Sequence, residues 1–199
     1  HLYSEPLQKF RLAARGHGEI QPPEKDRARI EAYFDPIPIW YPPFEGTMVD
    51  TEDFPLHALS QRPMQMYHSW GSQNAWLRQI TGSNKLYVGM EVAQQKGIED
   101  GDWVWIESHH GRVKAQVALM DGVNKHTVWT WNAIGKRAGA WNLDKDAGEA
   151  TKGFLLNHII SELLPERNGY RYSNSDPITG QAAWYDLRVK IEKAKPEEA

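Results

Sequence analysis

The chain has 199 residues, a net charge of −3 and a pI of about 6.3, and it contains no cysteine. The charge balance excludes the basic surface of nucleic-acid-binding domains, and the lack of cysteine excludes disulfides, thiolate zinc sites and iron–sulfur ligands within this stretch. No apolar run approaches the length of about 18 residues that a membrane-spanning helix needs, and no signal peptide is recognisable. Because the chain begins at His1 and its length suits one domain with an ordered flank, we expect it to be a piece of a longer protein.

Residues 1–53 are rich in proline and weakly periodic. The stretch DPIPIWYPPFE, Asp35–Glu45, cannot form a regular helix or a central strand, because its prolines fix φ and remove backbone donors. We predict that residues 1–53 form an extended linker or interdomain segment. Its aromatic side chains Trp40, Tyr41 and Phe44 are expected to pack on the following domain or on a neighbour outside the chain. The alternative is a flexible tail.

The next segment opens a predicted β domain, which we place at residues 54–193. A strand-like run, Leu56–Leu59, leads into residues 60–62 (SQR), and the loop His68–Asn74 (HSWGSQN) follows. This loop combines small residues, hydroxyls and amides. Small residues let backbone N–H groups approach a phosphate, whereas hydroxyls and amides suit the polar edges of a heterocycle.

The stretch Leu86–Val117 carries the clearest secondary-structure signals of the chain. Met90–Lys96 has helix-forming character, and Gly97 stands where a helix C-cap favours positive φ. Trp103–Glu107 and Val113–Leu119 alternate β-formers and are separated by a turn, so they predict a hairpin.

The remainder of the chain alternates loops with regular segments. A strand at Thr127–Thr130 is followed by Trp131-Asn132, and apolar residues at positions 154, 155, 159, 160, 163 and 164 predict a helix over Gly153–Leu164. The polar stretch Glu166–Asn174 is typical of a loop, and Tyr185–Lys193 predicts a last strand. Residues 194–199 are expected to form a disordered tail.

Three blocks of the sequence carry a resemblance. They are HSWGSQN at His68–Asn74, LYVGMEVAQQKGIEDGDWVWIESHHGRVKAQV at Leu86–Val117, and SNSDPITGQAAWYDLRV at Ser173–Val189. In this order and spacing they resemble the C-terminal domain of the molybdopterin oxidoreductases of the dimethyl sulfoxide reductase family. The resemblance implies a mainly β fold: a six-stranded double-psi β-barrel with short helices and a Pro-rich extended N-terminal segment.

In that family the C-terminal domain binds molybdopterin guanine dinucleotide, and the resemblance assigns this role to amide, hydroxyl, aromatic and cationic side chains. The candidate cofactor-binding residues are Gln61, Arg62, His68, Ser69, Ser72, Gln73, Asn74, Trp131, Asn132, Asn157, Asn174 and Gln181. Because they lie far apart in sequence, a shared ligand predicts that they converge on one face of the barrel. The alternative for each single asparagine is an ordinary turn residue, and for His68 it is a general base or metal ligand. No residue is predicted to be catalytic or to bind a metal.

The resemblance also implies an activity and a set of cofactors. Three segments are similar to quinone-linked sulfite dehydrogenases: WGSQNAWLRQI (Trp70–Ile80), WNAIGKRAGAWNLDKDA (Trp131–Ala147) and NSDPITGQAAWYDLRV (Asn174–Val189). The parent enzyme is therefore expected to oxidise sulfite or to act on another inorganic sulfur compound. Thiosulfate, polysulfide and tetrathionate reductases and formate dehydrogenases are the alternatives. The expected cofactors are two molybdopterin guanine dinucleotides with molybdenum, with tungsten as the alternative metal, and an iron–sulfur cluster elsewhere in the parent chain.

The expected partners are the N-terminal domains of the parent chain, an iron–sulfur electron-transfer subunit and a membrane anchor subunit. Nucleic acid is not expected to be a partner. The expected location is cytoplasmic and membrane-associated through these partners, with the periplasm as the alternative. The 9 tryptophans leave two further interpretations open. One is a carbohydrate- or ligand-binding β module with exposed, coplanar aromatic rings, and the other is a structural barrel that mediates assembly. Core and interdomain packing is the favoured use of these large side chains.

Overall fold

The structure is a computed structural model, and it forms two compact units. It describes residues 4–38, 40, 43–132, 134, 144, 148, 153–160, 163–167, 170–173, 175, 176, 178–182 and 187–198. The first unit comprises His1–Pro43 with Ser175–Ala182, and the second comprises Phe44–Asn174 with Ala183–Ala199. The predicted division, by contrast, separated residues 1–53 from residues 54–193. Among the described helices, none has the length and apolar character needed to cross a membrane.

The first unit contains two helices, α1 (Ser4–Ala14) and α2 (Glu24–Tyr33). Phe10 of α1 packs edge-on against Phe34, with ring centroids 5.5 Å apart, and Arg15 pairs with Glu31 at 2.8 Å. The prediction of an extended segment is therefore wrong for these 21 residues (11 in α1 and 10 in α2). The prolines do not prevent the helices, because Pro23 stands at the N-cap of α2, where no helical N–H is needed.

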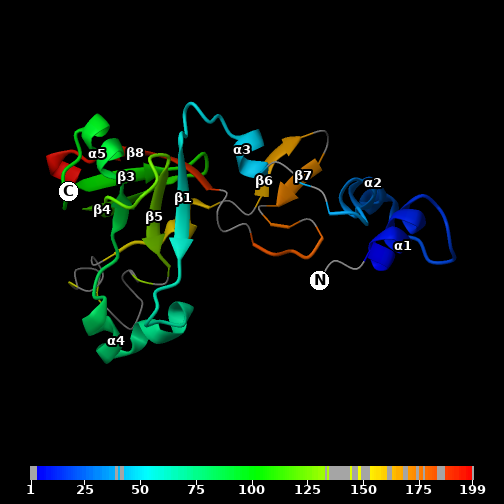
Figure 1. Cartoon of the computed structure of the whole chain (residues 1–199), viewed down its shortest axis with the longest axis horizontal. Helices are drawn as coiled ribbons and strands as arrows, with labels where there is room; N and C mark the ends of the chain where they lie inside the picture. Colours follow the sequence, from blue (N-terminus) through cyan, green and yellow to red (C-terminus); the bar gives the residue numbers. More distant parts are fainter. Residues whose placement is uncertain are drawn as a thin grey trace. The chain divides into compact units, whose positions relative to one another are not determined.

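The second unit is built around a closed barrel of six strands (Figure 1). The strands are β1 (Leu56–Gln61), β2 (Leu86–Val88), β3 (Trp103–Glu107), β4 (Arg112–Leu119), β5 (Thr127–Trp131) and β8 (Leu187–Lys193). Around the barrel they follow the order β1-β5-β2-β4-β3-β8. The strands predicted from Leu56, Trp103, Val113 and Thr127 are confirmed, and β8 lies within the last predicted strand.

The strand pairing makes this barrel a double-psi barrel. A psi loop consists of two consecutive antiparallel strands that enclose a third strand between them. Strand β5 lies between β1 and β2, parallel to the first and antiparallel to the second. Strand β2 likewise lies between β4 and β5, parallel to β4. Each loop thus encloses one strand of the other, and the six-stranded double-psi barrel of the predicted fold class is confirmed.

The core of the barrel follows from alternating burial along its strands. Strands β3 and β5 bury every second residue, and the inward side chains include Val104, Ile106 and Val128, each fully buried. Removing these apolar side chains from water stabilises the fold by about 25 cal/mol per Å². The barrel is therefore closed around its own apolar side chains.

The stretch Leu86–Val117 has the predicted local structure. Helix α5 (Met90–Lys96) ends at Gly97, which has a φ of +63° and donates its N–H to the carbonyls of Ala93 and Gln94. Ser108 closes the β3–β4 hairpin through a 2.9 Å bond from its N–H to the carbonyl of Gly111.

Three predictions for the C-terminal third are wrong, because the stretch Glu166–Asn174, predicted as a loop, instead carries residues of two paired strands, Leu163–Arg167 and Tyr170–Ser173. Instead of a helix over Gly153–Leu164 there is a 3-10 turn, η4 (Leu156–Ile159), and a strand, β6 (Leu163–Arg167), that pairs with β7 (Tyr170–Ser173). Phe154, Leu156 and Ile159 enter the barrel core, and this burial outweighs the helical spacing. The expected disordered tail carries a short 3-10 helix, η5 (Pro196–Glu198), and its buried Ala194 donates an N–H to the Trp103 carbonyl at 2.8 Å.

A buried acid attaches the short helix α3 (Phe44–Met48) to the barrel. The Glu45 carboxylate is fully buried and accepts the backbone N–H of Arg188 at 2.8 Å. His109 Nδ1 lies 3.7 Å from the same carboxylate, and burial, together with the charge of His110, lowers the pKa of His109. We interpret this cluster as a structural contact between α3 and β8.

Candidate functional site

The candidate site lies where β1 and β5 end side by side. The two strands are parallel, so their last residues, Gln61 and Trp131, stand opposite each other in the register. The Asn132 N–H donates to the Gln61 carbonyl at 2.7 Å, which extends the pairing beyond the strand ends. The structure thus brings together Gln61, Arg62, Trp131 and Asn132, four candidates that lie about 70 residues apart as two pairs, as the parallel register requires.

Asn132 carries a buried acceptor on its side chain. Its side-chain Oδ1 is buried and has no hydrogen-bond partner within the described part of the chain. Such an atom costs about 1–3 kcal/mol, and most buried polar atoms in folded proteins are paired. Gln61, whose carbonyl pairs with the Asn132 backbone, and the adjacent Arg62 are both exposed. An acceptor such as Asn132 Oδ1 beside them fits a ligand with N–H donors, such as the edge of a pterin or a guanine.

Asn84 holds this end of the barrel in shape, although no sequence motif selected it. It is buried, and its Nδ2 donates to the carbonyl of Trp131 at 2.9 Å and to that of Phe154 at 3.1 Å. Its Oδ1 accepts the Thr130 hydroxyl at 2.9 Å. Asn84 therefore fixes the backbone next to Asn132. The sequence feature that could have identified Asn84 is its position shortly before the strand β2.

Trp131 is positioned by an aromatic cluster on the outer face of β2 and β5. Tyr87 and Trp129 stack with ring centroids 4.0 Å apart and an interplanar angle of 9°. Trp131 meets Trp129 at 85° and donates its Nε1–H to the Tyr87 hydroxyl at 3.3 Å. These rings pack against one another on the outer face of the barrel, and use of the tryptophans in core and interdomain packing stays a prediction. The 85° angle between Trp129 and Trp131 does not match a coplanar sugar-binding platform.

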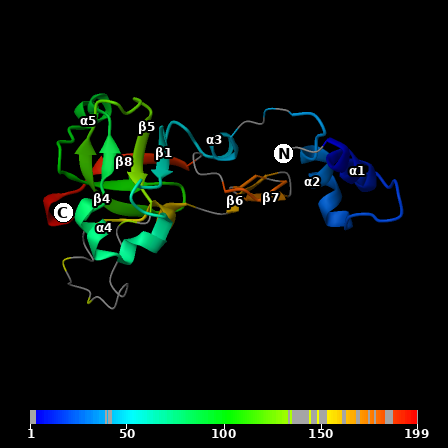
Figure 2. The same cartoon turned by 60° about the horizontal axis from the view of Figure 1, so that its bottom comes forward.

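The loop His68–Asn74 forms a 3-10 helix, η1 (His68–Gln73), followed by α4 (Ala75–Ile80). Helix α4 lies at the end of the barrel toward which β1 and β5 point (Figures 1 and 2). His68 has a φ of +49°, the one positive value among the described non-glycine residues, and Ser72 is buried. Backbone strain of this kind concentrates at functional sites. The side chains of Ser69 and Gln73 lie outside the described part of the structure.

Asn74 has a structural role that the sequence analysis did not foresee. Its Oδ1 accepts the N–H groups of Trp76 at 2.9 Å and Leu77 at 3.4 Å, so it is the N-cap of α4. The Asn74 amide keeps its two N–H donors for other partners. The oxygen that caps α4 and the amide donors of this side chain are thus different atoms.

The remaining candidates are not placed with this group. Asn157 is exposed on η4, Asn174 lies outside the described residues, and Gln181 belongs to the first unit. The Gln181 carbonyl accepts the Asp176 N–H at 2.7 Å within the expected turn. Burial works to raise the pKa of Asp176, but hydrogen bonds from Thr179 and Ile178 outweigh it and lower that pKa. Convergence of these three residues on the barrel stays a prediction.

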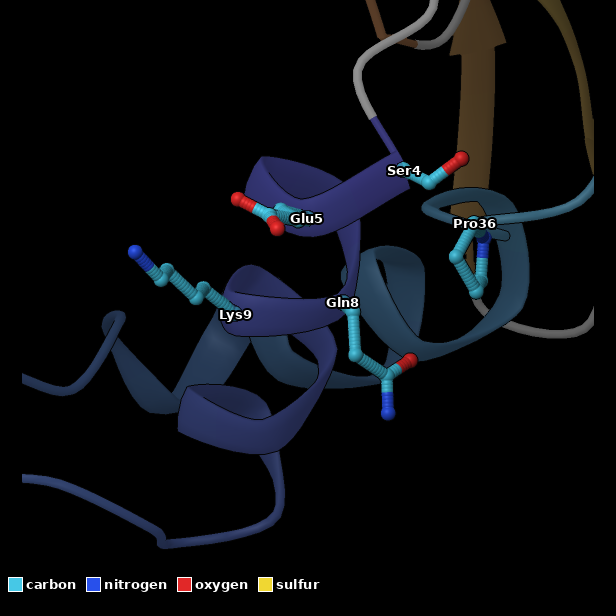
Figure 3. A pocket seen from close by; sticks show the side chains of 5 residues that line it. All are labelled: Ser4, Glu5, Gln8, Lys9 and Pro36. Carbon is cyan, nitrogen blue, oxygen red and sulfur yellow. The ribbon is translucent and has the colours of Figure 1, made fainter.

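Other sites in the described residues offer less chemistry. No group of three or more His, Asp or Glu side chains is close enough to hold a metal ion in the described part of the chain. A shallow, open hollow on the first unit is lined by Ser4, Glu5, Gln8, Lys9 and Pro36. Figure 3 shows the Glu5 and Lys9 side chains extending away from Pro36, so they do not converge on a common point.

Comparisons with known proteins agree with this geometry. Residues 56–164, more than half of the chain, match the Molydopterin dinucleotide binding domain. A sulfite dehydrogenase subunit of Allochromatium vinosum is 58% identical over 200 residues, which are 100% of this chain and 21% of that protein. The thiosulfate reductase molybdopterin-containing subunit of Salmonella typhimurium is 31% identical over 85 residues, covering 43% of this chain and 11% of that protein.

A solved structure supports the fold. Acetylene hydratase from Pelobacter acetylenicus superimposes with a TM-score of 0.61 at 18% identity, covering 82% of this chain and 22% of that chain. The chain therefore spans about a fifth of the length of the curated relative with 58% identity and of this structure.

Proposed function

Because the chain belongs to the Molydopterin dinucleotide binding domain family, we propose that it is the cofactor-binding portion of a molybdenum oxidoreductase that oxidises sulfite. The observation that carries the cofactor site is the buried Oδ1 of Asn132 at the shared end of β1 and β5, which has no hydrogen-bond partner among the described residues. The 58% identity across the whole chain to a sulfite dehydrogenase subunit supports the substrate. Identity falls to 31% over 43% of the chain for the thiosulfate reductase subunit, so reduction of thiosulfate is the weaker candidate.

The residues at this end of the barrel suit a dinucleotide. Asn132 Oδ1 would accept an N–H from the heterocycle, and the exposed Gln61 side chain would supply further amide contacts. Arg62 would pair with a phosphate, which a guanidinium binds through two parallel hydrogen bonds. The Asn74 amide would donate to a heterocycle oxygen while its Oδ1 caps α4. When bound, the cofactor supplies the redox chemistry through its metal, and this chain supplies binding and orientation.

The finer parts of the proposal concern the parent enzyme. We propose two molybdopterin guanine dinucleotides with molybdenum, and an iron–sulfur cluster held elsewhere in the parent chain. Electrons would leave through an iron–sulfur subunit toward a membrane anchor and a quinone, with the enzyme on the cytoplasmic side. The resemblance of Trp70–Ile80 to quinone-linked sulfite dehydrogenases motivates this assembly.

The full-length parent polypeptide tests the proposal when it is produced in a host that makes the guanine dinucleotide cofactor. The purified protein should contain molybdenum and release an oxidised, fluorescent pterin, and sulfite should reduce a quinone analogue in its presence. Thiosulfate and formate serve as control substrates. Pterin with sulfite-independent activity would overturn the substrate, and protein without pterin would overturn the cofactor-binding function.

A further inference from the structure

Three readily oxidised rings contact one another on the outer face of β2 and β5. Tyr87 stacks on Trp129 with ring centroids 4.0 Å apart, and the centroids of Trp129 and Trp131 are 4.7 Å apart. The Nε1–H of Trp131 donates to the Tyr87 hydroxyl at 3.3 Å, so each ring contacts the other two. Indole and phenol lose a single electron more readily than the other side chains of this cysteine-free chain. We name Tyr87, Trp129 and Trp131 the ring cluster.

The ring cluster starts at the candidate cofactor site and stays in contact with solvent. Trp131 is the last residue of β5 and stands opposite Gln61, which the exposed Arg62 follows. All three rings are half-buried, and none belongs to the apolar core that closes the barrel. An oxidant at this end of the barrel therefore meets an accessible indole, Trp131, and that indole has a hydrogen-bonded phenol beside it.

We propose that the ring cluster is a radical relay, in which an oxidant takes one electron from Trp131 and Tyr87 then restores Trp131. The oxidant is a sulfur-oxy peroxyl radical, the anion that forms when sulfite loses one electron and combines with molecular oxygen. The exposed guanidinium of Arg62 is permanently charged and attracts such an anion to this end of the barrel. The role of the relay, though not the transfer itself, rests on the proposed function, because sulfite is the source of the oxidant.

The two steps of the relay balance in atoms and electrons. In the first step the peroxyl radical takes up one electron and one proton and becomes hydrogen peroxymonosulfate, while Trp131 loses one electron and its Nε1 proton and becomes a neutral indolyl radical. In the second step the O–H bond of Tyr87 breaks and a new Nε1–H bond forms on Trp131, so Trp131 is reduced and Tyr87 becomes a phenoxyl radical. A thiol or ascorbate in solution then returns one hydrogen atom to the Tyr87 oxygen.

The geometry favours the second step. The Tyr87 oxygen and the Trp131 nitrogen already share a hydrogen bond, so the hydrogen atom moves directly from one ring to the other. Oxidation of a phenol needs a base for the O–H proton, and here the indolyl nitrogen is that base. A phenoxyl radical is a weaker oxidant than a neutral indolyl radical at neutral pH, so the transfer is favourable. The parallel stacking of Trp129 on Tyr87, at 9°, holds the phenol in position.

Light-triggered oxidation of the 199-residue chain tests the transfer. Because the chain has no native cysteine, Arg62→Cys gives a single attachment point for a ruthenium photosensitiser at the Trp131 end of the barrel. A flash in the presence of a soluble cobalt(III) electron acceptor produces ruthenium(III), and transient absorption follows the indolyl and phenoxyl radicals. Tyr87→Phe removes the O–H but keeps the ring, and Trp131→Phe removes the first electron donor. Tyr67→Phe is the matched control, since Tyr67 is 65% exposed and its ring contacts that of His68.

The labelled chain should convert the indolyl radical to the phenoxyl radical at a rate that is independent of protein concentration and slower in D₂O, because an O–H bond breaks. Tyr87→Phe and Trp131→Phe should each lower the phenoxyl yield several-fold, and Tyr67→Phe should leave it unchanged. An undiminished yield in Tyr87→Phe, or a rate that rises with protein concentration, would overturn the transfer. So would equal rates in H₂O and D₂O, a comparison that needs neither ring variant and therefore holds even where one fails to fold.

Sulfur-oxy radicals generated without an enzyme test the role of the relay. Sulfite in air with a trace of cobalt(II) produces these radicals, and peptide mass spectrometry measures oxygen addition to each tryptophan in the presence of ascorbate. Tyr87→Phe should raise oxygen addition at Trp131 several-fold and leave it unchanged at Trp76, which is 78% exposed. Equal oxygen addition at Trp131 with and without the Tyr87 hydroxyl would overturn the role. Neither measurement needs pterin or turnover, so a parent enzyme without pterin would overturn the proposed function and leave the transfer standing.

Discussion

Two segments of the second unit, Leu86–Val117 and Met64–Ile80, differ in the burial of their apolar side chains. The first buries Val88, Val104, Ile106 and other members of one continuous core. The second buries Met66 and Ser72 among its described residues and leaves both of its tryptophans in solvent.

One segment thus builds the core of the barrel, whereas the other carries candidate cofactor-binding residues and exposes its apolar side chains. Leu86–Val117 contributes three strands and a capped helix, and its apolar atoms find partners inside the unit. Met64–Ile80 adds little apolar burial of its own and is held by a cap and a close glycine contact. Substitutions in the first segment should therefore act on stability, and substitutions in the second on binding.

The largest effect is expected from Ile106→Ala in the centre of β3. Ile106 is fully buried, and truncation of a buried Ile to Ala costs about 2–5 kcal/mol through lost burial and the cavity left behind. Urea unfolding of the 199-residue chain measures the loss. The exposed Met90→Ala on α5 is the control and should change the free energy of unfolding by less than about 0.5 kcal/mol. Equal losses for both variants would contradict the assigned core.

A smaller loss is expected from Asn84→Ala at the site end of the barrel. The substitution leaves the Trp131 and Phe154 carbonyls without their donor, at a cost of about 1–3 kcal/mol. Gln94→Ala, an exposed amide on α5, should be neutral. If Asn84→Ala unfolded at the same urea concentration as the wild type, the bracing role of Asn84 would be wrong.

Asn74 has a stabilising role and a proposed binding role, which belong to different atoms of its side chain. Asn74→Ala removes the α4 cap and should cost about 1 kcal/mol, whereas Asn74→Asp keeps a capping oxygen and should be nearly neutral. In the parent enzyme both variants lose the amide donors, so both should lower pterin content. Wild-type pterin content in Asn74→Asp would mean that Asn74 is a cap alone.

The smallest effect concerns Asp102 and Lys193, whose side chains meet at 2.6 Å on the barrel surface. The hydrogen bond from Lys193, with a further one from the Glu99 N–H, lowers the pKa of Asp102 below its ordinary value of 3.8. This stabilisation is present above pH 3.8 and is lost as the pH falls through the lower, folded-state pKa. Asp102→Asn should lower the Tm slightly at about pH 7, and the difference should shrink at lower pH. A difference that grew on acidification would contradict the assigned pair.

The parts of the fold that could be predicted from the sequence are those whose burial leaves a periodic pattern. Strands such as Trp103–Glu107 alternate because one face is buried, and their alternation is visible in the residues. Helices α1 and α2 were missed because Leu7, Ala14 and Ile30 are their only buried residues among those described, which produces no apolar stripe. The spacing of the apolar residues near Phe154 suggested a helix. These side chains instead reach the core from the 3-10 turn η4 and the residues beside it.

The candidate site was predictable in its outline and not in its details. Residues that follow parallel strands meet at one edge, so the proximity of Gln61 and Asn132 follows from strand order once the barrel is assumed. The burial of Asn132 Oδ1 away from any described partner and the three hydrogen bonds of Asn84 depend on tertiary contacts as distant as Phe154, which no local sequence pattern records.

The central claim is that the shared end of β1 and β5 holds the dinucleotide, and Asn132→Leu tests it most directly. In the cofactor-free 199-residue chain this variant should be at least as stable as the wild type, because it removes a buried acceptor that has no partner in the part of the chain that the structure describes. In the parent enzyme it should lower pterin and molybdenum content several-fold, while Gln94→Leu leaves both unchanged. Normal pterin content in a folded Asn132→Leu enzyme would contradict the account.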